Sequence, residues 1–582
     1  MINQLIHSDI HTYISSMGTE RRLVWFKPTD LRIHDNPVLT HAHVHSNNCG
    51  NNTAPHTSNE SYHQLKSFLN NQGKSADKDT TTCQCNINVM HVFVVDPIFT
   101  TSKLQHTGLP KMGILRLQHL IQSIDNLQCN LRKMGSELYI MYGNTVELLP
   151  SLCHRYHINS IYTSTPYITD ESNQYNQLQK QCNEINVKLY SYWMNSMIEQ
   201  NDCPFDYGDG PNIFTSFRTQ IEKNMIVRDW RDNTLIVQNK RLLNNVNVDI
   251  NDQSISIDIP SINKFNYSQV DIDKQLSLYN QHSNKLIQLG GGESSAINHL
   301  HSYIYQQQLP STYKQTRNGM LATSLFSTQF SSYLSHGTLS ARLIYDSIKQ
   351  YESHYTANDS TYWIIFELLW RDYWRLVIAP KFTHNLFTKY GIQSVLDVKQ
   401  SSDYIEPGWS TDMNKFAQWC TGHTGHQLVD ACMRELNECG WMSNRGRQIV
   451  ASFLTKDLCI DWRYGAEYFE SQLIDYDTAS NWGNWQYAAG VGTDPRAGRY
   501  FSLYKQAKQY DPQNDYINYW LHNDFVNGQY TVPKICALRF DGSSVHHNNN
   551  HKFYKSTTKQ NTKYNNKQQS RNYASSAALH NQ

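Results

Sequence analysis

The chain has 582 residues, and at roughly 100–200 residues per domain this length predicts two or three domains. Its 51 Lys and Arg balance 50 Asp and Glu, and the formal net charge of +1 excludes a polycationic packaging protein and a strongly acidic chain. No apolar run reaches the roughly 18 residues that a membrane span requires, so no membrane partner is expected.

The N-terminal third alternates apolar strands with helices. Residues 1–20 lack the apolar core of a signal peptide and are interpreted as a flexible extension. Between 21 and 195, short apolar runs are expected to be buried strands, and 112–134 shows the apolar spacing of a helix. The strand candidates are Leu23 to Phe26, Val89 to Val95, Leu138 to Tyr142 and Ser160 to Tyr162. This alternation predicts a Rossmann-like parallel α/β sheet, although no GxGxxG fingerprint follows the first strand.

Four further segments complete the predicted organisation. Residues 43–87 are rich in Asn, His, Ser and Thr, which predicts a largely disordered insertion. Residues 196–289 have weak periodicity and are interpreted as an interdomain connector, whereas 290–535 has helical periodicity with aromatic residues throughout. Residues 536–582 are rich in Asn, Gln and Lys and predict a disordered tail.

Charge and cysteine usage limit the partners and the compartment. From Ser543 onward the chain holds six cations and no acid, so the remaining residues carry a formal charge of −5. Binding of nucleic acid by the folded body would therefore require a local basic patch. The twelve Cys show no metal-ligand spacing and are typical of reduced thiols in an intracellular protein, and no metal site is expected. The compartment itself stays open.

The run Ser360 to Ile378 predicts an amphipathic helix with an unusual face. Trp363, Glu367, Trp370 and Trp374 fall at i, i+4, i+7 and i+11 and share one side of it. A carboxylate among indoles suits the binding of a heteroaromatic ligand. The alternative is a core helix in which Glu367 pairs with Arg371 at i+4.

Three other runs have the chemistry of a binding site. Gly440 to Gln448 brings two Arg and two amides to a helix start, and such groups suit phosphates and base edges. Asp475 to Tyr487 alternates acids, amides and aromatic residues that could surround a heteroaromatic ring. Ser327 to Ser331 offers hydroxyls and backbone N–H groups to a pyrophosphate. A solvated helix start, an Asx-rich turn and an ordinary loop are the respective alternatives.

Together these runs resemble the photolyase/cryptochrome flavoprotein family and, within it, the DASH cryptochromes. The similarity covers about 21–42 and 88–530, and includes NIFTSFR at 212–218, YKQTRN at 313–318, FELLWRD at 366–372 and GTDPRAGRY at 492–500. The resemblance implies an α/β antenna domain over 21–195 and an all-α FAD-binding domain over 290–535.

The resemblance also assigns roles to individual positions. The cofactor is expected to be FAD, with its phosphate and ribityl parts bound by Tyr313, Ser327, Thr328, Gln329, Phe330 and Ser331. Its ring is expected to contact Asp475, Asp477 and Asn481, with Arg447 paired to Asp475. Trp485, Trp462 and Trp409 match an electron-transfer chain. A wall facing DNA is expected from Arg317, Glu367, Trp370, Arg371, Asn444, Arg445, Gln448 and Tyr487.

The implied activity is light-driven repair of cyclobutane pyrimidine dimers by electron transfer from excited reduced FAD. Gln448 and Tyr487 stand where many double-strand photolyases have Met and Trp, so single-stranded or looped DNA is the expected substrate. A blue-light photoreceptor with little repair activity is the alternative. Glu171 resembles the acid that contacts a 5,10-methenyltetrahydrofolate antenna, or is a solvated carboxylate at a helix start. A monomer is expected.

Overall fold

The computed structural model describes residues 20–43, 58–70, 87–236, 238, 242, 244–249, 252–282, 289–321, 325–396, 408–494 and 500–526. The predicted tail over 536–582, and the N-terminal extension apart from Glu20, lie outside these ranges. Within the described residues, no helix has both the length and the apolar character needed to cross a bilayer.

The N-terminal domain is a parallel sheet with the strand order β3-β2-β1-β4-β5. The strands are β1 (Glu20–Phe26), β2 (Ile87–Val95), β3 (Leu138–Tyr142), β4 (Ser160–Ser164) and β5 (Lys188–Tyr192), and a short β6 (Asn244–Asn245) pairs with the start of β2. The predicted α/β class is confirmed. Because β1 lies at the centre and the chain builds outward from it in both directions, a topological switch point falls beside β1.

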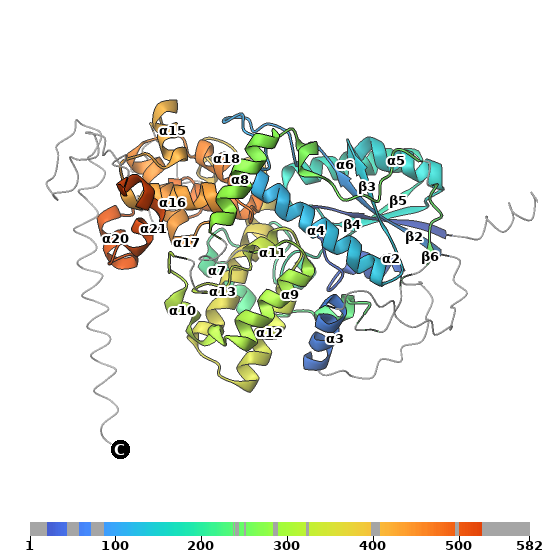
Figure 1. Cartoon of the computed structure of the whole chain (residues 1–582). Coiled ribbons are helices and arrows are strands. Elements are labelled where there is room, and N and C mark those ends of the chain that lie inside the picture. The colour runs from blue at the N-terminus through green and yellow to red at the C-terminus, as the bar shows by residue number, and fades with distance from the viewer. Residues whose placement is uncertain are drawn as a thin grey trace, which may run out of the picture.

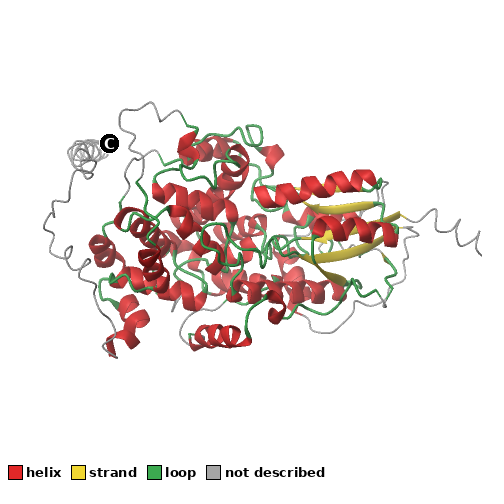
Figure 2. Cartoon of the chain, turned by 90° about the horizontal axis from the view of Figure 1, so that it is seen from above, coloured by secondary structure: helices red, strands yellow, loops and turns green. Residues whose placement is uncertain are grey.

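Helices cover both faces of this sheet (Figure 2). Val24 and Phe26 of β1 pack into one core with α4 (Ile114–Lys133) and α2 (Pro37–His43). Leu23 and Trp25 point the other way, into a second core with α5 (Thr145–Tyr156) and α6 (Thr169–Glu184). This burial on two faces explains why the strands are almost continuously apolar.

The C-terminal domain is helical (Figure 1). Its helices are α9 (Glu293–His301), α10 (Tyr313–Thr316), α11 (Ser331–Ser335), α12 (Ala341–His354), α13 (Asp359–Tyr373), α14 (Ala379–Lys381), α15 (Met413–Thr421), α16 (Gln427–Cys439), α17 (Asn444–Ser452), α18 (Trp462–Gln472), α19 (Thr478–Ala489), α20 (Leu503–Tyr510) and α21 (Asp515–Val526). A capping box at Asn358 starts α13, and a π-helical turn, Trp374–Ile378, continues it. The helix expected over 360–378 is therefore present.

The prediction of a largely disordered insertion over 43–87 is wrong at its centre. Residues Ser58–Asn70 form α3, which packs near α9 and α12. Tyr62, Leu65 and Leu69 are at most 4% exposed and lie at i, i+3 and i+7, on one helical face. Most residues of α3 are polar, so the composition of the segment predicted disorder. Its few apolar residues nevertheless share one face, which is buried.

The connector over 196–289 also has more structure than its weak periodicity predicted. It contains α7 (Phe214–Lys223), α8 (Gln269–Gln281) and β6. Phe214, Phe217 and Ile221 bury one side of α7 in the main core. Three turns of helix with only one apolar stripe give a weak signal over a window of 94 residues.

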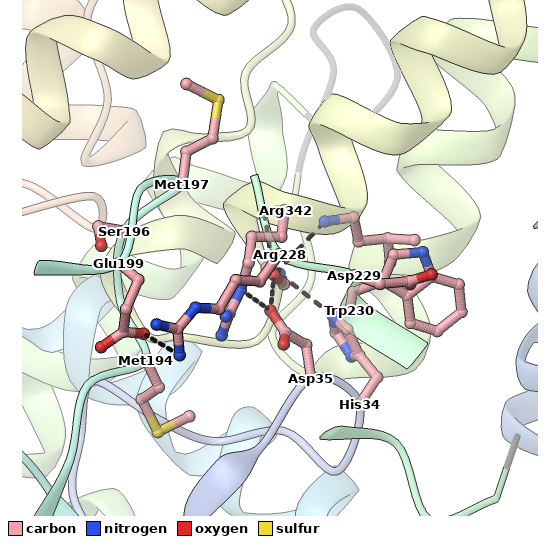
Figure 3. Close-up of polar contacts among 12 residues, drawn as sticks. His34, Asp35, Met194, Ser196, Met197, Glu199, Arg228, Asp229, Trp230 and Arg342 are labelled. Atoms are coloured by element: carbon pink, nitrogen blue, oxygen red, sulfur yellow. Dashed lines mark hydrogen bonds and ion pairs between the residues drawn. The ribbon is translucent and has the colours of Figure 1, made fainter. Parts of the chain in front are cut away.

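Buried charges join the two domains. Arg342 Nε of α12 donates to Asp35 Oδ2 in the loop after β1 at 2.9 Å, and both side chains are at most 4% exposed (Figure 3). In the same loop, the backbone N–H groups of Ile33 and His34 and the His34 ring contact the fully buried carboxylate of Glu293, at the start of α9. Because each charge has a partner in the other domain, these contacts fix the orientation between the domains.

Candidate functional site

A cavity of about 550 Å³ lies inside the helical domain. It gathers most of the residues that the sequence assigned to a site: Tyr313, Arg317, Ser327, Thr328, Gln329, Phe330, Ser331, Glu367, Trp370, Arg371, Asn444, Arg447, Gln448, Asp475, Asp477, Asn481, Trp485 and Tyr487. These residues span 175 positions of sequence from Tyr313 to Tyr487 and come from α10, α11, α13, α17, α19 and the loops before them. Arg445, Trp409 and Trp462 do not line this cavity.

Asp475 is buried at one side of the cavity. Its Oδ2 accepts from Arg447 Nη2 at 2.8 Å, which is the pairing that the family resemblance implied. Its Oδ1 is buried and has no hydrogen-bond partner among the described residues. A buried carboxylate oxygen without a donor is costly, so this atom is suited to accept a hydrogen bond from a ligand in the cavity.

Asp477 is held by a denser set of contacts. Its Oδ1 caps α19 by accepting from Ser480 N at 2.8 Å, and its Oδ2 accepts from Tyr167 Oη at 2.9 Å and pairs with Arg375. Burial alone would raise the pKa of the Asp477 carboxyl, but Arg375 and Arg371 hold that pKa well below its usual range. Asp477 is therefore a permanent anion at neutral pH.

The sequence reasoning missed Arg375 and Tyr167. Arg375 is 1% exposed and lies in the apolar run Trp374–Ile378. A cation inside an apolar run needs an anionic partner in the protein interior. The position of Arg375 in the sequence therefore indicated that a buried carboxylate lies beside it. Its partner is 102 positions away, so no local pattern could identify it.

The loop Ser327 to Ser331 gives the cavity a polar corner. His299 Nε2 bonds with the carbonyl oxygen of Thr328 at 2.8 Å and anchors the loop. Gln329 adopts a left-handed backbone, with φ of 50°, and its buried Oε1 has no partner among the described residues. The hydroxyls and backbone N–H groups of this loop line the cavity, and groups of this kind suit a pyrophosphate.

The opposite wall is the aromatic face of α13. Arg317 Nη1 donates to Glu367 Oε1. The alternative pairing of Glu367 with Arg371 is wrong, because the Arg371 guanidinium instead donates to the carbonyl oxygens of Asn195 and Leu334. Burial raises the pKa of the Glu367 carboxyl, and Arg317 opposes that rise. Arg371 thus lines the cavity and also connects Asn195, which follows β5, to Leu334 of α11 through hydrogen bonds.

Arg445 lies beside the cavity and not in it. Its Nη2 donates to Asn318 Oδ1 at 3.1 Å, and its guanidinium lies 4.4 Å from the Tyr510 ring centre. Phe501, which does line the cavity, also faces Arg445 at 6.0 Å. Arg445 therefore contacts a residue that lines the cavity without lining it itself.

The three tryptophans of the expected chain have distinct surroundings. Trp485 lines the cavity, and Trp462 is fully buried with its Nε1 donating to the Lys389 carbonyl oxygen at 3.0 Å. Trp409 is half-buried, next to Ser410, which bridges to Ile460. The burial therefore decreases from Trp462 to Trp409, which is the order expected of a route to the surface.

A second cavity, of about 400 Å³, lies between the domains. Trp25, Lys27, Val94 and Asp96 line it, so it opens at the carboxyl ends of β1 and β2, where ligands of open α/β sheets bind. Glu171 lines this cavity and is not a solvated carboxylate on the outer surface. Burial raises the pKa of Glu171, while Lys27 and Arg375 oppose that rise.

The second cavity also has unsatisfied polar atoms. Thr29 Oγ1, Thr169 Oγ1 and Arg116 Nε line it, and each is buried without a hydrogen-bond partner within the described part of the chain. One guanidinium N–H donor and two hydroxyl groups without partners in an enclosed space favour a polar ligand.

Comparison with known proteins identifies the class to which this fold and site belong. Residues 22–232 match the family model of DNA photolyase, and residues 363–531 match that of the FAD binding domain of DNA photolyase. The chain is therefore a member of the photolyase/cryptochrome class.

More similar relatives place it within that class. It is 36% identical to a Cryptochrome DASH of Gloeobacter violaceus over 507 residues, 87% of this chain and 86% of the relative. It is also 36% identical to the chloroplastic/mitochondrial Cryptochrome DASH of Oryza sativa, over 78% of this chain and 77% of the relative. The crystal structure of a Synechocystis cryptochrome is 34% identical and superposes with a TM-score of 0.70, covering 87% of this chain and 90% of that one. The chain belongs to the cryptochrome DASH family.

A more distant solved structure shares the fold. An archaeal photolyase from Sulfolobus tokodaii shares the fold at a TM-score of 0.59 and 22% identity, over 88% of this chain and 95% of that one. That protein is described as containing two FAD molecules, one implicated as a novel light-harvesting cofactor. The large cavity of this chain fits FAD, because it lies in the domain that matches the FAD-binding model and is lined by the unpaired Asp475 and Gln329 oxygens, which can accept hydrogen bonds from a ligand.

Proposed function

We propose that this protein repairs cyclobutane pyrimidine dimers in single-stranded or looped DNA, driven by blue light. The observation that carries the proposal is the joint cavity, in which a flavin-type acid pair and an aromatic wall with a carboxylate face the same space. When bound, reduced FAD supplies the electron that opens the dimer after excitation and then takes it back.

The residues of the chain would bind and orient the two reactants. A dimer extruded from the strand can stack on Trp370, and the Glu367 carboxyl and the Gln448 amide can hydrogen-bond its base edges. Asn481 lies across the cavity, and its Nδ2 donates to the Ala466 carbonyl oxygen at 3.0 Å. Because an amide does not ionise, Asn481 has no acidic proton to give to a reduced ring.

The substrate form follows from the polarity of the wall. Extruding a dimer from duplex costs a few kcal/mol of unstacking and unpairing, and less from a single strand. Gln448 and Tyr487 both line the cavity, and their polar groups must be desolvated when the dimer enters. We therefore expect efficient repair of single-stranded or looped DNA and weak repair of fully paired duplex.

One experiment tests both the activity and the preference. Purified protein, reduced and illuminated, is given the same dimer-bearing oligonucleotide alone and annealed to its complement, and dimer loss is measured at saturating substrate. Equal rates and affinities on both forms would contradict the preference. Absence of light-dependent loss on either form would favour the alternative, a blue-light photoreceptor that signals through a partner.

The second cavity is proposed to hold a 5,10-methenyltetrahydrofolate antenna, with Glu171 contacting the pterin. The enclosed position of Glu171 and the unpaired Thr29, Thr169 and Arg116 atoms support a polar planar ligand there. Absorbance and mass of the small molecules released by denaturing the protein would identify it. A second flavin, in place of a folate, would contradict the assignment. Sedimentation is expected to show a monomer.

A further inference from the structure

The segment Asn212 to Arg218 is one of those that resemble the DASH cryptochromes, but none of its residues lines either cavity. In the structure these residues lead into α7, which packs against α13. Phe214 is 7% exposed and does not line the cavity.

Phe214 covers one face of Trp370. The two rings are stacked with centroids 3.7 Å apart and an interplanar angle of 10°. Phe214 also makes edge contacts with Phe366 at 5.2 Å and Tyr373 at 5.7 Å, so its own ring is held from two more sides. Trp370 thus has one face covered by Phe214, and it also lines the cavity, where the ring centres of Trp374 and Tyr487 lie 5.9 Å and 6.1 Å from its own.

Arg218 lies one turn after Phe214 on α7. It contacts α13 at Phe366 and Tyr362, which lie before Trp370 on that helix. Its guanidinium lies 5.6 Å from the Phe366 ring centre, and its Nη1 donates to Tyr362 Oη at 2.6 Å. The pairs Phe214–Trp370 and Arg218–Phe366 run in opposite directions along the two helices. Contacts at both ends fix α7 antiparallel to α13, and with it the position of the Phe214 ring.

We propose that Phe214 is a positioning residue for dimer recognition, which holds the Trp370 indole in the orientation that the extruded bases stack on. This inference rests on the proposed function. A side chain ordered before binding does not have to be ordered by the ligand, so the stack raises affinity without touching the dimer. The dimer would extend the existing stack of two rings by one more layer.

The test compares Phe214→Leu with the wild-type holoprotein. Leucine keeps an apolar side chain of similar bulk but has no flat face. We expect the dissociation constant for a dimer-bearing single strand to rise on the order of 3- to 10-fold, the range that an aromatic pair contributes. The repair rate at saturation and the flavin absorbance should not change, because Phe214 lies outside the cavity.

Three further variants make the result specific. Phe214→Tyr retains the flat face and should restore wild-type affinity, and Trp370→Ala should weaken binding at least as much as Phe214→Leu. Phe217→Leu alters the same helix at a buried ring that contacts Tyr373 and Phe205, and it should lower thermal stability without changing affinity. Equal losses of affinity in Phe214→Leu and Phe217→Leu would overturn the inference, since they would show only a loosened helix.

A measurement without substrate separates this inference from the proposed function. In protein labelled with 5-fluorotryptophan, the Trp370 resonance, assigned from Trp370→Phe, should shift and broaden in Phe214→Leu. An unchanged resonance overturns the positioning role even if repair is found. A wild-type protein that binds no dimer, together with a shifted resonance, overturns the role in recognition and the proposed function while the stack itself stands.

Discussion

Replacing Asp477 by alanine is expected to destabilise the protein by about 3–5 kcal/mol and to prevent retention of FAD. The reason is Arg375, which is 1% exposed and would lose its carboxylate partner inside the protein. Alanine also removes the acceptor that caps α19 and the acceptor for Tyr167 Oη. Urea unfolding and the flavin-to-protein absorbance ratio of the purified variant would measure both effects.

Two matched variants separate the causes. Asp477→Asn retains an oxygen that can accept from Ser480 N, so it should lose the ion pair but keep most of the cap. Asp475→Ala removes the partner of Arg447, which is 26% exposed and can be hydrated, so the loss of stability should be smaller while flavin retention still falls. Wild-type flavin content in both alanine variants would contradict the assignment of this acid pair.

Replacing Trp485 by phenylalanine is expected to remove most of the light-driven reduction of oxidised flavin but to leave repair by pre-reduced protein largely intact. Trp485 would deliver electrons to the flavin, whereas a dimer receives its electron from it. Phenylalanine preserves the flat ring that packs against Phe469 at 5.0 Å, but it is much harder to oxidise than an indole. Illumination of oxidised protein with an external reductant, followed by absorbance, gives the rate.

Trp419→Phe is the control for Trp485→Phe. Trp419 also contacts Trp485, with ring centroids 6.1 Å apart, but does not belong to the proposed chain through Trp462 and Trp409. Normal photoreduction in Trp485→Phe, or a loss confined to Trp419→Phe, would show that the electrons take another route.

The elements that could be predicted from the sequence are those whose pattern lies within a few neighbouring residues. The strand at Leu23 to Phe26 and the aromatic face of α13 follow from runs and spacings of neighbouring residues. The pairing of Glu367 was not predictable from the helix itself, because Arg371 at i+4 was available and yet Arg317, 50 positions earlier, makes the contact. The Trp370 stack depends in the same way on a residue 156 positions earlier, in a segment with weak periodicity.

The position and burial of several residues depend on contacts between segments that are far apart in the sequence. Family motifs assigned roles to single residues, but only the folded chain shows that Arg445 does not line the large cavity and that Glu171 faces an enclosed space. The burial of α3 depends on a surface supplied by α9 and α12, and a window of 13 residues does not contain that information.

The loop after β1 forms buried ion pairs and hydrogen bonds with α9 and α12. Each domain therefore buries charged groups of the other. A cut in the connector, with the N-terminal half removed, would take away the partners of Glu293 and Arg342 and expose to water the surface that now buries them. The domains are thus distinct in architecture but not separable as modules. Insertions and deletions are tolerated more easily away from such a junction, in exposed segments of the chain.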